Sequence, residues 1–310
     1  MNSLFGEDKK EIKTVEKRSE ILFCYDVTDA NPNGDPMDSN KPRIDEETNI
    51  NFVTDVRLKR TIRDYLYEYK GYNGKDDKDI FVREIIYDDK NGYIQDGKLR
   101  AKNFKENAKD ILNKCIDIRA FGGVIPLNKD SITYTGPIQF KIGRSLHKVE
   151  LKHIKGTGAF ASKEKSKQAT FREEYILPYS FIAFHGIINE VAAKHTNLTD
   201  DDVKILLDAM WNGTKNLISR SKFGQMPRFL LKVTYKESGF FIGDLEKYIK
   251  ISEVENEYKI RSVKDFKLDI TELLDVLEEN NDKIEKIEYK ADNLLQFKGE
   301  IPDNWKELGL

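Results

Sequence analysis

The chain has 310 residues, 39% of them hydrophobic and 34% charged, and its 52 basic and 54 acidic side chains give a formal net charge of −2. This length and composition predict a globular protein of one large or two small domains, and they exclude a fibrous or wholly disordered chain. No run approaches 18 apolar residues and residues 1–20 lack a signal-peptide apolar core, so no membrane is expected and the predicted location is cytoplasmic.

Cysteine and histidine usage gives no support for a metal or catalytic site. Cys24 and Cys115 lie in apolar segments without C-x-x-C spacing, which predicts buried thiols and no disulfide framework. His147, His153, His185 and His195 show no metal-binding spacing, and His185 lies inside an apolar segment, where a core histidine is expected. We therefore predict no metal, no cofactor and no catalytic residue, hence no enzyme.

The near-neutral total charge averages two unlike regions. Residues 237–310 carry 11 basic and 19 acidic side chains, a net −8, whereas residues 1–236 carry 41 and 35, a net +6. This asymmetry permits a basic surface on the first part of the chain.

In chain order, residues 1–18 are a polar lead-in, and Ile21–Tyr25 begins a buried strand that ends near Thr28 in a loop rich in Asn, Pro, Gly and Asp. Asn33-Gly34 and two prolines stop strand pairing and leave backbone amides and small polar side chains at the strand tip. A helix is predicted from about 52 to 66, with an apolar stripe that includes Leu58 and Ile62.

The middle of the chain is predicted to contain a strand, a helix and a glycine turn. We expect a strand over 80–87, an Asn91-Gly92 turn, a helix over 101–115 and a strand over 131–142. Arg119, Phe121, Gly122 and Gly123 lie between the last two, and the glycine pair could admit a phosphate or base close to the backbone. A tight turn before a strand explains the same glycines.

A basic segment follows. Residues 141–172 hold nine Lys or Arg and two Glu, with Phe160 among small residues, so this window should protrude as a basic hairpin or loop. A solvated charge run is one interpretation, and contact with single-stranded nucleic acid is the other.

The last predicted elements are a strand over 175–188, a helix from Val203 to Gly213 capped at Thr199, a basic loop over 219–225 and a strand over 228–235. Their order fits a ferredoxin-like α+β core with long insertions. Residues 237–310 are read as an acidic appendage with helices over 270–279 and 282–291.

Several stretches together carry a family resemblance. YDVTDANPNGDP, KPRIDEETNINFVTDVRLKRTIRDYL, IRAFGGVIP, TGPIQF and YILPYSFIAFHGIIN span most of residues 18–236. They closely resemble the Cascade backbone subunit, the seventh CRISPR-associated family, in its type I-B and I-C branch. The resemblance implies an RRM-like palm over 19–236 with finger insertions and a protruding basic thumb over about 143–172.

The same resemblance implies a function and partners. Such a subunit binds CRISPR RNA, polymerises with copies of itself along the guide spacer in a helical filament, and presents the guide for pairing with target DNA. Its other partners are further Cascade subunits and, through them, a helicase-nuclease.

The predicted RNA-binding residues combine cations with strand-tip and loop positions. Arg57 and Arg60 share one helix face and Lys59 and Arg63 another, so one pair is expected to be ordinary surface charge. Phe160 is assigned as the thumb wedge by position alone. The full set is Asn31, Asn33, Lys41, Arg43, Arg57, Lys59, Arg60, Arg63, Arg119, Phe121, Gly122, Gly123, Phe160, Lys163, Arg220, Ser221 and Lys222.

Two rival functions remain open. Asp26, Asp29 and Asp35 cluster at the strand tip, and related type III subunits use an Asp in this loop to cleave target RNA, so a metal-assisted ribonuclease is one rival. Turn formation accounts for Asp29 and Asp35 equally well. The other rival is a stand-alone RRM-type RNA-binding protein.

Overall fold

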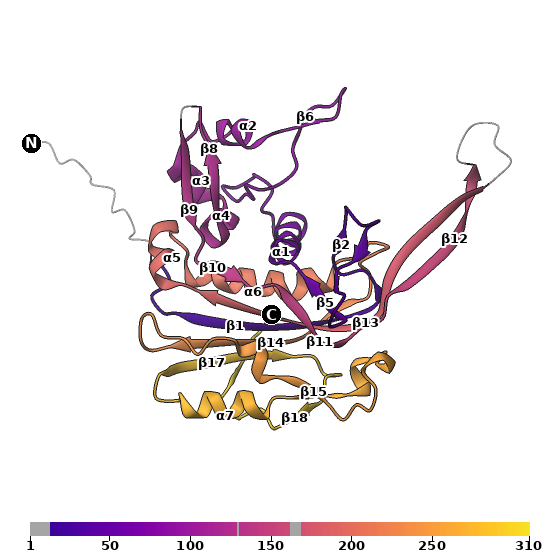
Figure 1. The fold of residues 1–310 in the computed structure, drawn as a ribbon. Helices are drawn as coiled ribbons and strands as arrows, with labels where there is room; N and C mark the ends of the chain where they lie inside the picture. Colours follow the sequence, from indigo (N-terminus) through magenta and orange to yellow (C-terminus); the bar gives the residue numbers. More distant parts are fainter. Residues whose placement is uncertain (1–12, 129, 162–168) are drawn as a thin grey trace, which may run out of the picture.

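One large sheet with β1 at its centre organises the chain in this computed structural model (Figure 1). The structure describes residues 13–128, 130–161 and 169–310, and of residues 157–161 and 169–172 it describes the backbone only. The strands of this sheet follow the order β19-β17-β14-β1-β13-β11-β5-β4, and β10 and β12 also pair with β13. They are β1 (Ser19–Ala30), β4 (Ile44–Asp45), β5 (Ile50–Val53), β10 (Ile138–Phe140), β11 (Gly143–Lys148), β12 (Lys152–Ala161), β13 (Ala169–Ile188), β14 (Gln225–Tyr235), β17 (Ile284–Ala291) and β19 (Lys306–Glu307).

Strand β1 is apolar from Ile21 to Tyr25 because both of its faces are buried there. Phe23 faces the core that contains α1 and α6, and Leu22 and Cys24 face a second core built with the C-terminal region. Its neighbours β13 and β14 both run antiparallel to it. A strand buried on two faces is predicted to be a continuous apolar run, as this one is.

Two helices cover one face of the sheet (Figure 1). Helix α1 (Asp55–Tyr69) is capped by Thr54, and α6 (Asp200–Lys215) begins with a capping box between Thr199 and Asp202. The short helix α5 (Glu190–Thr196) precedes α6. The predicted strand at 21–28 and the capped helix after Thr199 are both confirmed. The helix predicted from about 52 begins instead at Asp55, because residues 50–53 form β5 in the main sheet.

An insertion between α1 and β10 has its own small core, which includes Phe81, Phe104 and Ile111. Its elements are β6 (Ile86–Asp88), β7 (Tyr93–Ile94), α2 (Gly97–Lys102), α3 (Ala108–Lys114), α4 (Ile116–Phe121), β8 (Gly122–Pro126) and β9 (Ser131–Thr135). The strand predicted over 80–87 is largely absent, since only β6 at its end is regular. The turn predicted at Asn91-Gly92 closes the β6–β7 hairpin.

Two predicted elements of this region are each split in two. Lys105 and Glu106 adopt positive φ, and the Asn107 side chain caps a new helix by accepting from two amides of α3. The helix predicted over 101–115 is therefore wrong as a single element, because a capping Asn competes with continuation of the helix. The strand predicted over 131–142 breaks at Gly136-Pro137 between β9 and β10.

A long hairpin of β12 and the first half of β13 projects from the sheet (Figure 1). It confirms that part of the basic window protrudes. Its start differs from the predicted 143, because β11 stays in the main sheet, paired with β13 and β5.

The C-terminal region is mixed rather than helical. Its α-helix is α7 (Thr271–Glu279), and residues 284–291, predicted as a helix, form β17 along the open edge of β14. Local Lys and Glu content favours a helix, but eight residues of sheet pairing and the buried Lys232–Glu288 ion pair override it. The remaining elements are β15 (Lys250–Ser252), β16 (Lys267–Asp269), β18 (Phe297–Lys298) and the 3-10 helices η1 (Leu245–Tyr248), η2 (Glu257–Lys259) and η3 (Val263–Asp265).

The α+β class is thus confirmed. Within the polar lead-in, Val15 is buried and Thr14 pairs with Thr199, the N-cap of α6, so this part of the lead-in lies at the start of that helix. Nowhere in the described ranges does a helix have the length and apolar character needed to cross a membrane.

Candidate nucleic-acid interface

The loop at the tip of β1 is held against the start of α1. The Asn33 side-chain oxygen accepts from both the backbone N–H (2.9 Å) and the hydroxyl (3.0 Å) of Thr54, which is the N-cap of α1. Strands β2 (Gly34–Asp35) and β3 (Lys41–Pro42) pair within the same loop. Asn33, a predicted contact residue, therefore fixes the first turn of α1, where Arg57 lies.

A second loop, residues 216–224 between α6 and β14, joins the β1 tip. The Asn31 N–H donates to the Ser221 carbonyl (2.8 Å), and the Lys222 ammonium donates to the Asn31 carbonyl (2.5 Å). The Thr28 N–H donates to the Gly224 carbonyl at 3.0 Å. Asn31 was predicted from one stretch and Ser221 and Lys222 from another, and the structure brings the two stretches together.

Arg57 and Lys222 form a pair of like charges at this junction. Burial and the nearby positive charge of Arg57 lower the pKa of Lys222 to about 8, and burial lowers the pKa of Arg57. No carboxylate in the described ranges forms an ion pair with either side chain. Two partly buried cations without a counterion are favourably placed to bind an anion such as a phosphate.

Buried polar atoms without partners gather around the same junction. Asn31 Oδ1, Arg43 Nε and Gln225 Nε2 are buried and have no hydrogen-bond partner in the described structure. Gln225 begins β14 opposite Val27 of β1. Because a buried polar group without a partner is costly, these atoms are positions where a water or a ligand would complete the hydrogen bonding. We call Asn31, Arg43, Arg57, Lys222 and Gln225 the β1-tip site.

The other cations of α1 are already neutralised. Lys59 binds Asp55 (2.9 Å) and Gln139 (2.9 Å), and Arg60 binds Asp64 (2.6 Å) on the surface. Arg63 is mostly buried and pairs with Asp117 at 3.0 Å. Of the four predicted helix cations, Arg57 is thus the one that forms no ion pair with any residue that the structure describes.

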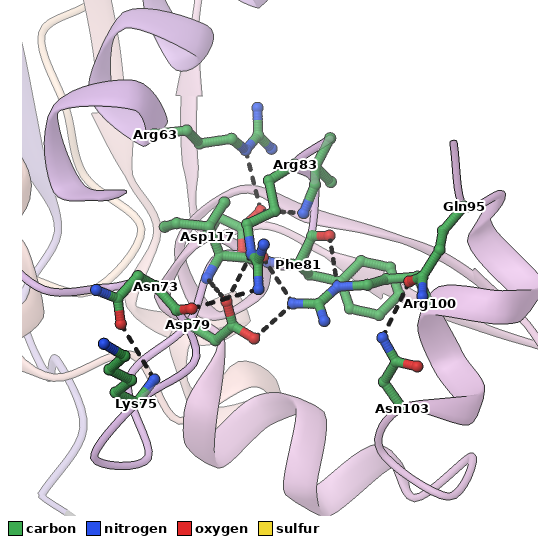
Figure 2. Close-up of polar contacts among 12 residues, drawn as sticks. Arg63, Asn73, Lys75, Asp79, Phe81, Arg83, Gln95, Arg100, Asn103 and Asp117 are labelled. Carbon is green, nitrogen blue, oxygen red and sulfur yellow. Dashed lines mark hydrogen bonds and ion pairs between the residues drawn. The ribbon is translucent and has the colours of Figure 1, made fainter. Parts of the chain in front are cut away.

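Arg63 belongs to a structural network that joins α1 to the insertion (Figure 2). Asp117 accepts from Arg63 and from the Phe81 and Val82 amides, and Asp79 binds both Arg83 and Arg100. These arginines hold the insertion in place.

The segment from Arg119 to Gly123 is also structural in the described chain. Arg119 makes two bonds to Asp202 (3.0 and 2.7 Å), and Phe121 is buried beneath Lys59 and Arg63. A Cβ on Gly122 would lie 2.2 Å from the Tyr134 carbonyl oxygen. The glycine at this position is explained by close packing of β8 on β9 and Gly136, which favours the tight-turn interpretation, and Gly123 pairs with Tyr134 in the same ladder.

The two loops of the site also contact the base of the projecting hairpin. Arg220 makes two bonds to Glu174, and the Lys41 ammonium lies 5.5 Å from the centre of the Tyr175 ring while binding Asp38. The Phe160 backbone lies in β12, but its side chain and all of Lys163 lie outside the described residues.

The strand-tip carboxylates do not converge on a metal position. Asp26 is buried and bound to Arg228 (2.9 Å) and the Tyr179 hydroxyl (3.0 Å), and burial raises its pKa against the opposing charge of Arg228. Asp35 binds Arg43 and the Met37 amide, whereas Asp29 is exposed with φ 48°. The geometry thus gives each of these three residues a separate environment.

One group elsewhere has metal-like spacing: His185, Asp244 and Glu246 have ligand atoms within 4.8 Å of one another. The Lys141 ammonium bonds to both carboxylates, so a cation already compensates them. His185 is buried with its Nε2 2.7 Å from Glu20, which confirms the predicted core histidine. Cys24 and Cys115 are buried free thiols, as predicted.

Two residues near the β1 tip, Gln225 and Phe223, were not among the predicted RNA-binding residues. Phe223 lies in the basic loop that contributed Arg220, Ser221 and Lys222, and its side chain is 67% exposed. An aromatic residue inside a short basic run between a helix and a strand was the available signal. For Gln225 the sequence holds no such signal, since its role follows from its pairing opposite the β1 tip.

Comparisons with known proteins agree with one another. Residues 17–271 match the family model for CRISPR-associated protein Cas7. A Haloferax volcanii protein described as CRISPR-associated protein Cas7 is 32% identical over 306 residues, which cover 92% of this chain and 89% of that protein.

Two solved structures share the fold at low identity. A chain of a CRISPR RNA-guided surveillance complex, pre-nicking, has a TM-score of 0.56 and 10% identity and covers 94% of this chain and 95% of its own. A chain of a second CRISPR RNA-guided surveillance complex has a TM-score of 0.53, 11% identity and the same coverage.

Proposed function

The chain belongs to the Cas7 family of CRISPR-associated proteins, and from this membership we propose that it is the CRISPR RNA-binding backbone subunit of a type I Cascade surveillance complex. The family is the one that the sequence motifs resemble. Assignment to the I-B or I-C branch rests on those motifs alone and remains a prediction.

The observation that carries the proposal is the uncompensated charge of Arg57 and Lys222 in the β1-tip site. A guide RNA has arbitrary sequence, so its carrier has to grip what all guides share, which is the phosphate backbone. Two cations fixed on a helix and a loop, with buried polar atoms beside them, supply such a grip.

The rest of the proposal concerns assembly. Copies of the chain polymerise along the guide spacer, each with its palm on a short segment of phosphates and its projecting hairpin directed to a neighbour as a thumb. The guide then pairs with target DNA, and other Cascade subunits recruit a helicase-nuclease in the cytoplasm. The hairpin of β12 and β13 supports this arrangement because it leaves the sheet as a long, unaccompanied pair of strands (Figure 1).

We also propose that the chain binds RNA without cutting it. The support is the engagement of Asp26 by Arg228 and of Asp35 by Arg43, since a metal-assisted ribonuclease would need free, convergent carboxylates. This proposal keeps the chain within the type I mode of action, in which a separate protein cleaves the target.

The test combines mass measurement with imaging. Purified protein is mixed with RNAs of increasing length and with magnesium, and RNA integrity is checked on the same samples. Regular growth of a helical filament on intact RNA is expected, and an Arg57→Glu, Lys222→Glu variant should fail to grow it. A fixed one-to-one complex would instead identify an isolated RNA-binding module, and magnesium-dependent loss of a complementary RNA strand would identify the ribonuclease.

A further inference from the structure

Phe223 is the most exposed phenylalanine whose side chain the structure describes. It is 67% exposed, and Phe241, at 44%, is the other one on the surface. Ile218, on the same loop, is 69% exposed. Single apolar side chains at a surface are ordinary, so the significance of Phe223 depends on its surroundings.

The loop that carries Phe223 has a defined backbone. Its turn is closed by the Phe223 N–H, which donates to the Ser219 carbonyl at 2.8 Å. The backbone N–H groups of Asn31 and Thr28 donate to the carbonyls of Ser221 and Gly224, which come before and after Phe223 in the loop. Gly224 has φ +113°, and a Cβ there would lie 2.4 Å from the Thr28 carbonyl oxygen. The ring is therefore presented by a fixed turn anchored to the tip of the central strand.

The charges around this ring favour a polyanion as its partner. Lys222 is the preceding residue, its ammonium is directed to Asn31, and Arg57 is close enough to lower its pKa. A flat apolar ring beside cations without counterions is complementary to single-stranded nucleic acid, which presents phosphates and unstacked bases side by side. A protein partner with an apolar patch would leave Arg57 and Lys222 uncompensated.

We propose that Phe223 is a stacking platform for one nucleobase of the RNA whose phosphates are bound by Arg57 and Lys222. This inference rests on the proposed RNA-binding function and adds to it a contact with base faces. The platform does not read sequence, because every base offers a π-face.

Three substitutions at one position separate stacking from simple apolar contact. Phe223→Ala should lower affinity for single-stranded RNA at fixed salt by about 5- to 150-fold, the range that corresponds to one lost base stack. Phe223→Leu, similar in apolarity but without a π-face, should lose most of the same affinity, and Phe223→Trp should keep it. Phe241→Ala is the matched control, since Phe241 is an exposed phenylalanine near Arg18, at the other end of β1.

The Phe223→Trp variant also gives a direct readout. Its added indole is expected to be exposed, whereas native Trp211 and Trp305 are buried. RNA should quench the added emission, and RNA with an abasic nucleotide at the stacked position should quench it less.

The outcomes distinguish failure of the stacking platform from failure of the proposed RNA-binding function. Wild-type protein that binds no RNA would overturn both. Wild-type binding with unchanged affinity in Phe223→Ala and Phe223→Leu, and no quenching in Phe223→Trp, would overturn the platform alone. Dissociation of an RNA-free oligomer by Phe223→Ala in sedimentation, with RNA affinity unchanged, would show that the ring is an interface between copies and would also overturn the platform.

Discussion

Arg57 and Lys222 are 165 residues apart in the sequence, yet the guanidinium of Arg57 lies close enough to the Lys222 ammonium to help lower its pKa to about 8. Within the described ranges neither forms an ion pair with a carboxylate. This separates them from the other predicted cations that the structure describes, each of which is paired with an Asp or Glu.

Removal of either cation should weaken RNA binding and reduce its salt dependence. Each phosphate contact on a single strand contributes about 0.7 to the slope of log affinity against log salt, so Arg57→Ala and Lys222→Ala should each lower the slope by about that amount. The loss should be equal on unrelated RNA sequences, as measured by fluorescence anisotropy over a salt series. Lys204→Ala is the matched control, because Lys204 lies near Ser19 at the opposite end of β1. If the slope of log affinity against log salt is unchanged in both Arg57→Ala and Lys222→Ala, these residues do not bind RNA phosphates.

RNA affinity should fall with rising pH through Lys222. Its pKa is about 8 in the free protein, and a bound phosphate should raise it, so the complex requires a proton that the free protein loses above pH 8. Affinity should drop by about tenfold between pH 7 and 9. Lys222→Arg should remove most of this dependence, since guanidinium stays charged. Identical pH profiles for the two proteins would show that Lys222 does not contact RNA.

Without RNA, the same charge should destabilise the folded protein. The pKa of Lys222 is lower in the folded state than its usual 10.5, so the unfolded chain binds more protons between pH 8 and 10.5 and the free energy of unfolding should rise with pH across that window. Lys222→Met removes this buried charge but also removes the hydrogen bond to the Asn31 carbonyl, which offsets part of the gain. The net effect should be a free energy of unfolding higher by about 1 kcal/mol at pH 7, as measured by urea titration. It should lower RNA affinity at the same time.

Gly122 should prove necessary for stability rather than for RNA contact. Gly122 and Gly92 both have φ +68°, but a Cβ on Gly122 meets the Tyr134 carbonyl oxygen at 2.2 Å, whereas nothing lies within 4 Å of one on Gly92. Gly122→Ala should lower the free energy of unfolding by about 2–4 kcal/mol, and Gly92→Ala by about 1 kcal/mol. Chemical denaturation measures both. If Gly122→Ala folds normally and loses RNA affinity instead, the glycine contacts RNA.

Arg119 should behave as a structural residue too. Its pair with Asp202 joins α4 to α6 and is largely buried, so Arg119→Ala should lower the free energy of unfolding by about 3 kcal/mol. Arg60→Ala breaks the exposed pair with Asp64 and should cost under about 1 kcal/mol. RNA affinity of folded Arg119→Ala, measured well below its melting temperature, should equal that of the wild type.

Much of the fold could be predicted because its central unit has local signals. The apolar run of β1, the turn residues after it and the stripe of α1 are each visible within a few residues. The strand at 284–291 was predicted as a helix because its Lys and Glu are helix formers, and the deciding fact is an open edge of β14 about fifty residues earlier. Sheet pairing of this kind has no local signature.

The site was predicted in outline but not in detail. The sequence indicates which residues are cations, but whether a cation is free depends on distant carboxylates, such as Asp117 for Arg63 and Asp202 for Arg119. Arg57 and Lys222 differ from the other described cations of the predicted set in having no ion-pair partner among the described residues. The predicted set of basic residues therefore combined the two cations of the proposed site with several that hold the protein together.

The position of β1 has a consequence for synthesis of the protein. β1 is made before both of its partners, β13 and β14, which begin 139 and 195 residues after Ala30, and β14 ends at Tyr235. At about 5–20 residues per second, the ribosome takes on the order of 10–40 s to deliver β14 after β1. During this interval an apolar strand with two unpaired edges is exposed, which invites mispairing between nascent chains. Loop 216–224, which carries Lys222, is also made after β13, so the proposed β1-tip site can form only once the chain from β1 to the start of β14 has been translated.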